Sequence, residues 1–224
     1  MTASARGGNK HTLHLSNPPT ERQHSLLPSH FLSALTSRLL PMTPHPLLER
    51  LLEDESFRSA GSIDGNVPDA FGLYAIRLHR DAILPEPFGS ELALRASRLL
   101  YLGEARTQTL RGRLLGNEPR ARGHGTFFRS LGAVLGYRPP LGSLLRNANQ
   151  RNYRFAPADE QAIVEWINTN LDVSWVTLES EIHANEVALI REHTPLLNLE
   201  DNPRPLLDLK ELRALCCRIA GTRH

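Results

Sequence analysis

The chain has 224 residues, of which 40% are hydrophobic and 22% are charged, and its formal net charge is +2. This composition is typical of a globular protein with one sizeable core, and it excludes a disordered or fibrous chain. No apolar run approaches the roughly 18 residues that a membrane-spanning helix needs, so we expect no membrane partner. The two cysteines, Cys216 and Cys217, are adjacent and lack further ligands at zinc spacing, which favours a reducing, cytoplasmic location.

The first 41 residues are predicted to be a disordered or short helical extension, because they are polar and mostly lack a hydrophobic period. Met42 follows this extension, and we hypothesise that translation begins there rather than at Met1. Residues 42–70 are predicted to hold an amphipathic helix over 46–52 and a loop rich in Gly, Ser, Asp and Pro.

Two apolar runs, residues 71–78 and 98–103, predict β-strands. The 19 residues between them, 79–97, predict an unusually long loop, since hairpin loops usually have two to five residues. Glycine beside a strand tyrosine lets another backbone or a ligand approach closely. Each run has such a pair: Tyr74 follows Gly72, and Tyr101 precedes Gly103.

The remaining chain is predicted to be mainly helical, with one further strand over residues 173–178. The helices are expected over about residues 107–115, 127–135, 159–168, 179–193 and 207–219.

Two of these helices carry a charge on their apolar stripe. Glu186 lies on the stripe formed by Ile182, Leu189 and Ile190, and a carboxylate there needs a partner. A divalent cation such as Mg²⁺ is one such partner, and a buried salt bridge, for instance to Arg113, is the alternative. Arg113 lies between Leu110 and Leu114, where it either binds a phosphate or extends to solvent from the stripe edge.

Charge is strongly segregated along the chain. Residues 105–154 contain ten arginines and one acid, Glu118, whereas residues 155–202 contain ten acids and one base, Arg191. A basic block of this kind predicts contact with the nucleic-acid backbone. A GC-rich genome would explain the low lysine content but not the clustering. The candidate contacts are Arg106, Arg111, Arg120, Arg122 and Arg129.

Four ordered motifs resemble those of the GIY-YIG nuclease family. They are Gly72-Leu73-Tyr74, Tyr101-Leu102-Gly103, the Leu110–Leu114 helix with Arg113, and a closing segment from Glu186 to Asn198. The resemblance covers about residues 71–202 and leaves 203–224 as a C-terminal helix packed on that domain. It implies an α/β (α+β) fold, namely a small three-stranded antiparallel sheet flanked by helices.

The resemblance implies a divalent-metal-dependent DNA endonuclease of the stand-alone or restriction type. Glu186 would hold one Mg²⁺ or Mn²⁺, and Arg113 would hold the scissile phosphate. Tyr74 would activate or orient the attacking water, with Tyr101 in support. Asn198 would bond to the backbone or to a phosphate near the site. Cleavage of both strands would suit a homodimer.

One departure from the family leaves the general base open. The histidine that many members carry one turn after the arginine is Asn117 here. Tyr74 and His124 are therefore both candidates for the base. The alternative function is a catalytically weak or inactive nucleic-acid-binding protein on the same fold, which a closed salt bridge between Arg113 and Glu186 would favour.

Overall fold

The computed structural model describes residues 46–95 and 97–223. The extension expected over residues 1–41 and the proposed start at Met42 lie outside this part of the chain. The described elements all belong to one compact unit. Among the described residues, no helix has both the length and the apolar character needed to cross a membrane.

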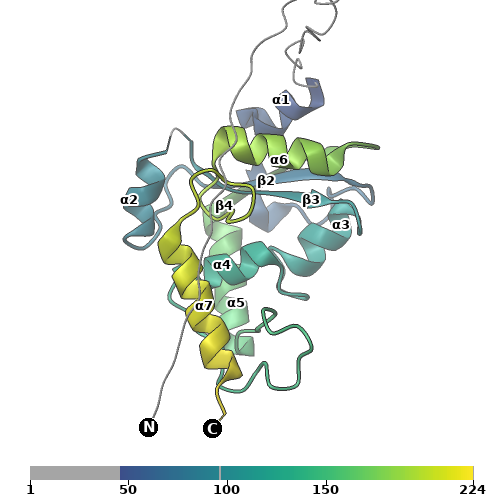
Figure 1. Ribbon diagram of the computed structural model, residues 1–224. Coiled ribbons are helices and arrows are strands. Elements are labelled where there is room, and N and C mark those ends of the chain that lie inside the picture. Colours follow the sequence, from purple (N-terminus) through teal and green to yellow (C-terminus); the bar gives the residue numbers. More distant parts are fainter. Residues whose placement is uncertain (1–45, 96, 224) are drawn as a thin grey trace, which may run out of the picture. The chain divides into compact units, whose positions relative to one another are not determined.

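A four-stranded antiparallel sheet, with the strand order β1-β4-β2-β3, is the centre of this unit (Figure 1). Strand β2 (Gly72–Leu78) pairs with β3 (Leu99–Ala105) on one side and with β4 (Leu171–Thr177) on the other. These three strands confirm the predicted sheet. The fourth strand, β1 (Arg58–Ser59), has only two residues and pairs with β4, so it is too short to show a hydrophobic alternation.

Helices cover both faces of the sheet (Figure 1). On one face lie α1 (Pro46–Leu52) and α6 (Ile182–His193), which form a core with the β2 residues Leu73 and Ala75. On the other face lie α4 (Thr126–Val134) and α5 (Pro157–Asn170), with α7 (Leu207–Gly221) packed on α4. Successive strand side chains point to opposite faces, so Tyr74 faces this second core.

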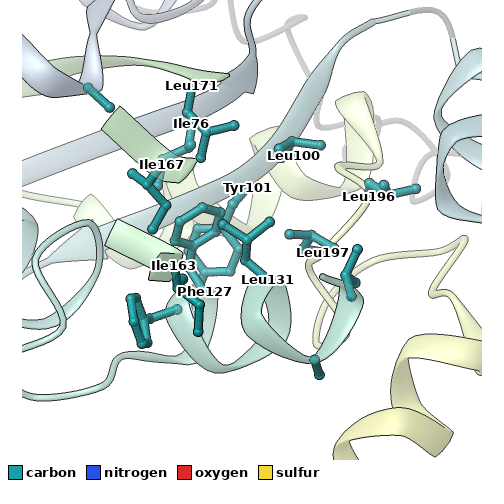
Figure 2. Packing of buried hydrophobic residues seen from close by; sticks show 14 of the residues in the cluster. Ile76, Leu100, Tyr101, Phe127, Leu131, Ile163, Ile167, Leu171, Leu196 and Leu197 are labelled. Atoms are coloured by element: carbon teal, nitrogen blue, oxygen red, sulfur yellow. The ribbon is translucent and has the colours of Figure 1, made fainter. Parts of the chain in front are cut away.

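The second core contains both predicted catalytic tyrosines, and Tyr101 is tightly packed in it. Figure 2 shows Tyr101 beside Phe127 and Leu131 of α4. The ring centroids of Tyr101 and Phe127 lie 5.6 Å apart, within the range for favourable aromatic contacts. The Tyr101 ring therefore has a packing role in the core, which is separate from any catalytic role of its hydroxyl.

The segment expected to be a long loop between β2 and β3 contains a helix, α2 (Phe88–Ala93). Leu84, Phe88 and Leu92 are buried and join the second core. Three large apolar side chains thus anchor this insertion, which compensates for the entropy of ordering it. Two single turns of 3₁₀-helix, η1 (Asp54–Ser56) and η2 (Ala60–Ser62), flank β1.

The helix that carries Arg113 changes its winding at that residue. Its first turn, α3 (Leu110–Gly112), begins where the Thr109 hydroxyl accepts a hydrogen bond from the Gly112 amide, at 3.3 Å. The chain continues as a π-helical turn, η3 (Arg113–Asn117), in which the Glu118 amide donates to the Arg113 carbonyl at 3.1 Å. The backbone hydrogen bond to the Arg113 carbonyl is therefore made by Glu118 and not by Asn117.

The outer edge of β3 is partly covered by a segment that follows α6. The amides of Leu196 and Leu197 donate to the carbonyls of Leu99 and Leu100, at 3.2 and 2.8 Å. The Asn198 side chain then bonds to both the amide and the carbonyl of Leu102, each at 2.9 Å. This segment therefore provides hydrogen-bond partners for the outer backbone groups of β3 as far as Leu102. The candidate site begins at the next residues of the strand.

Candidate active site

Four of the predicted catalytic residues, Tyr74, Tyr101, Arg113 and Glu186, lie around β3, but on both faces of the sheet. Tyr74 and Tyr101 belong to the core under α4, whereas Glu186 lies on α6, over the opposite face. Burial dominates the pKa of Glu186, yet the positive charge of Arg113 lowers it. Arg113 and Glu186 therefore lie close enough to act on each other around the end of the strand.

The tyrosine and glycine of the two signatures contact each other across β2 and β3. Tyr74 pairs in register with Gly103, and a Cβ atom on Gly103 would lie only 2.3 Å from the Tyr74 hydroxyl. This explains why the position needs glycine. The Tyr74 and Tyr101 ring centroids lie 6.2 Å apart. Burial, and next the charge of Glu118, raise the pKa of both phenols, so both stay protonated at neutral pH.

Glu118, which the sequence analysis did not propose, links these groups. Its side chain is fully buried, and its Oε1 atom accepts from the Tyr74 hydroxyl at 3.5 Å and lies 3.6 Å from Nε of Arg113. Its Oε2 atom accepts from the Phe128 amide at 3.3 Å, in the first turn of α4. A Cβ atom on Gly125 would lie 2.1 Å from the carboxyl group, so this glycine makes room for it.

The sequence did hold a signal for Glu118, because it is the single acid among the ten arginines of residues 105–154. A single acid among many arginines is expected to form an ion pair with one of them. Burial raises the pKa of Glu118, whereas the charge of Arg113 opposes that rise. Glu118 and Arg113 thus form a coupled, largely buried ion pair.

Arg113 does not form the salt bridge with Glu186 that would have favoured the alternative function; its ion-pair partner in the described part of the chain is Glu118. Burial alone would lower the pKa of Arg113, but Tyr74 and Glu118 more than compensate and keep it charged. Its side chain is 27% exposed, and although Tyr74 lies within hydrogen-bonding reach of it, the guanidinium has five N–H donors. Arg113 therefore keeps donors for an anion.

A second cluster, formed by Glu104, His183 and Glu186, lies beside this pair. Nδ1 of His183 lies 3.3 Å from Oε2 of Glu104 and 3.5 Å from Oε2 of Glu186. One ligand atom from each of the three residues lies within 4.8 Å of the others. Burial, and then the nearby charge of Glu104, raise the pKa of Glu186 to about 7. The sequence analysis found Glu186 but neither Glu104 nor His183.

The donor set of this cluster fits a divalent cation. Two half-buried carboxylates lie side by side, an arrangement that a positive charge between them would stabilise. Oxygen and imidazole nitrogen are both ligands that divalent metals accept in proteins. The predicted metal ligand Glu186 thus lies among groups that can complete its coordination.

His124 lies in a different environment, against the rings of Phe128 and Phe155. Nδ1 accepts from Nε of Arg154 at 3.2 Å, and Nε2 lies 2.8 Å from Oε1 of Glu160. Since Arg154 occupies the Nδ1 lone pair, the proton of the neutral ring is on Nε2. Neither nitrogen then offers a lone pair to a water. Burial and the charge of Arg154 lower the pKa of His124 to about 4.

The six predicted nucleic-acid contacts divide into two groups. Arg106, Arg111 and Arg122 are exposed, and Arg106 pairs with Glu104 at 2.6 Å. The side chains of the other three residues bind partners within the protein. The structure therefore does not support the predicted DNA contact for these three. Arg120 binds Asp64, Asn168 and the Ala60 carbonyl, Arg129 is buried on the His124 carbonyl, and Asn198 is buried on Leu102.

Comparison with known families agrees with this geometry. The family model described as the GIY-YIG catalytic domain matches residues 72–215, from the first residue of β2 into α7. A search of curated proteins found no match, and neither did a search of solved structures. The matched segment is more than half of the chain and contains all the clusters described above. The chain therefore belongs to the GIY-YIG catalytic domain family.

Proposed function

We propose that this protein is a divalent-metal-dependent endonuclease that hydrolyses DNA phosphodiester bonds. Membership of the GIY-YIG family supports a nuclease, and one observation carries the finer proposal. Glu186 lies in a cluster with Glu104 and His183 whose ligand atoms are within 4.8 Å of one another, and the charged side chain of Arg113 is 27% exposed beside Glu118. The free thiols of Cys216 and Cys217 agree with a cytoplasmic location.

In this proposal Arg113 binds the scissile phosphate and offsets the charge that develops on it during attack. Glu186 holds the cation from α6, on the other side of the same strand end. When bound, Mg²⁺ or Mn²⁺ supplies Lewis-acid stabilisation of the phosphate and of the leaving 3′ oxygen. Glu118 keeps the Arg113 side chain in place through its Nε contact.

The roles of the tyrosines follow from their protonation. A phenol whose pKa is raised is a poor base at neutral pH, but the Tyr74 oxygen, whose proton is donated to Glu118, can still accept a hydrogen bond from a water. Of the two roles predicted for Tyr74, orienting and activating the water, we therefore propose the first. Tyr101 supports the Tyr74 ring. We do not assign the base to His124, since Nδ1 accepts from Arg154 and Nε2, which carries the proton, faces Glu160.

A plasmid-cleavage assay tests the proposal. Wild-type protein with Mg²⁺ or Mn²⁺ is expected to nick supercoiled DNA, and Glu186→Ala is expected to lower the rate at least about 100-fold. Glu192→Ala, which alters an exposed carboxylate of the same helix, is the matched control and should cut normally. Equal rates for wild type and Glu186→Ala would refute the assigned metal role.

The order of products tests the homodimer that was expected from the sequence. One active site cuts one strand at a time, so a monomer accumulates nicked circles before linear DNA. A dimer that cuts both strands in one encounter yields linear DNA directly.

The burial of both tyrosines favours a second candidate, a nucleic-acid-binding protein with weak or no catalysis on the same fold. In the described structure the Tyr74 hydroxyl donates to Glu118 rather than facing solvent. DNA binding without cleavage on supercoiled, branched and single-stranded substrates, with several metals, would support this candidate.

A further inference from the structure

The cluster of Glu104, His183 and Glu186 offers three candidate metal ligands, whereas the sequence predicted one, Glu186. Glu104 comes from β3, and the other two come from consecutive turns of α6. Rigid elements therefore hold all three side chains. The mutual distances of 3.3 and 3.5 Å from Nδ1 of His183 are close to the spacing of neighbouring ligands around one small cation.

One atom of this cluster lacks the partner that a buried polar group normally has. Oε2 of Glu104 is buried and makes no hydrogen bond within the described residues. The other oxygen, Oε1, is already held by Arg106 at 2.6 Å. This oxygen lies 3.3 Å from Nδ1 of His183, in ion-pair but not hydrogen-bond contact, and beside Glu186, so its lone pairs remain available to an ion within the cluster.

The kinds of donor then limit the kinds of cation. Mg²⁺ strongly prefers oxygen ligands and keeps much of its water. Imidazole nitrogen instead favours transition-metal ions, whose affinity for such sites rises from Mn²⁺ through Co²⁺ to Ni²⁺. A site with two carboxylates and one imidazole is therefore better matched to a transition metal than to Mg²⁺.

We propose that Glu104, His183 and Glu186 together form one three-ligand site, and that the His183 imidazole makes it select Mn²⁺ or Co²⁺ over Mg²⁺. The inference rests on the proposed function, because it refines the metal site of the same nuclease. It assigns to this chain two metal ligands beyond Glu186. Arg106 would orient Glu104 through its other oxygen, which leaves Oε2 for the ion.

Metal binding without DNA tests this inference independently of cleavage. The metal-free full-length protein is titrated calorimetrically with MnCl₂, CoCl₂ and MgCl₂ at one fixed pH. Wild type should bind Mn²⁺ and Co²⁺ at least about tenfold more tightly than Mg²⁺. His183→Ala should lower the Mn²⁺ affinity at least about tenfold and the Mg²⁺ affinity much less, whereas Glu104→Gln and Glu186→Gln should lower both.

A spectroscopic measurement identifies the nitrogen ligand directly. Pulsed electron paramagnetic resonance of bound Mn²⁺ should show coupling to ¹⁴N in wild type and not in His183→Ala. His183 is exposed and alanine favours helix, so this variant should fold, which circular dichroism checks. Glu192→Gln, on the same helix, is the matched control and should change neither affinity nor coupling.

The outcomes separate this inference from the proposed nuclease. Mn²⁺ bound without ¹⁴N coupling, or unchanged affinities in His183→Ala and Glu104→Gln, would overturn the three-ligand site even if the protein cuts DNA. Selective Mn²⁺ binding that depends on all three residues supports the site even if no DNA is cut, and the proposed function alone would then fail.

Discussion

At the scale of single residues, Glu118 has the largest structural role that the sequence analysis missed. It is fully buried and contacts the Tyr74 hydroxyl, Nε of Arg113 and the Phe128 amide. Removing one partner of a buried ion pair leaves the other uncompensated, which costs about 3 to 5 kcal/mol. Glu118 therefore matters both for stability and for the position of Arg113.

We expect Glu118→Ala to lower the free energy of unfolding by about 4 kcal/mol, and Glu118→Gln, which keeps the shape but not the charge, by about 2 kcal/mol. Urea denaturation at pH 7 measures both. Glu200→Gln, at an exposed carboxylate, is the control and should change little. An Ala variant as stable as wild type would contradict the buried network.

His124 gives a prediction about pH. Its pKa is lowered from about 6.5 to about 4 by burial and by Arg154. The unfolded chain therefore takes up this proton at a higher pH than the folded protein does. The stability that the neutral ring provides is complete above pH 6.5 and is lost as the pH falls toward 4, by up to about 3 kcal/mol.

Urea denaturation between pH 4 and 8, on wild type and His124→Asn, measures this effect. Asparagine tolerates the positive φ of 50° at this position, so the backbone should be kept. Other titrating groups cancel in the difference between the two proteins. The difference should shrink below pH 6.5, and a constant difference would show that His124 does not titrate as described.

At the scale of elements, the segment after α6 makes a further prediction. Asn198 bonds both backbone groups of Leu102, so Asn198→Ala should leave two buried groups unsatisfied and destabilise the protein by about 3 kcal/mol. Asn185→Ala, on α6, is the control, because its side chain makes no hydrogen bond within the described residues. Thermal unfolding compares the two variants.

If Asn198→Ala were as stable as Asn185→Ala but bound DNA more weakly, the result would instead favour the phosphate contact predicted for Asn198 from the sequence.

The elements that could be predicted are those with a repeating pattern. Strands β2 and β3 have apolar runs, β4 has an alternating pattern, and α4 and α5 have apolar residues at helical spacing, so each was predicted close to its true limits. Strand β1 is too short for any period, and α2 was hidden by Pro85, Pro87 and Gly89. These elements depend on tertiary contacts that local sequence does not show.

The site residues that could be predicted are likewise those that interrupt a sequence pattern. Arg113 and Glu186 are charges on apolar stripes, and that contrast is visible in the sequence. Glu118 is brought over Arg113 by one π-helical turn, which adds a residue that sequence spacing does not reveal. Glu104 and His183 look like ordinary polar residues until β3 and α6 are placed together.

At the scale of the whole molecule, folding partly mixes the charges that the sequence separates. Glu160 of the acidic block lies 3.9 Å from Arg154, and Arg120 pairs with Asp64. The basic surface is therefore smaller than the count of ten arginines suggests. The members of the block that remain exposed are Arg106, Arg111, Arg122, Arg146, Arg151 and Arg154.

The dependence of DNA binding on salt measures how many of these residues contact phosphate. Each contact that is removed should reduce the slope of log K against log salt by about 0.9. We expect Arg111→Ala and Arg122→Ala to reduce it by about this amount, because both side chains are exposed. Arg120→Ala should lower stability and leave the slope unchanged, since its guanidinium is held by Asp64 and Asn168.

Arg191→Ala is the matched control for this measurement. Arg191 is the single arginine of the acidic block and its side chain is 66% exposed, so its removal changes net charge as much as the other variants do. Fluorescence anisotropy with a labelled duplex at several salt concentrations gives each slope. If Arg191→Ala reduced the slope as much as Arg111→Ala, net charge rather than a defined surface would govern binding, because screened long-range attraction does not depend on which arginine is lost.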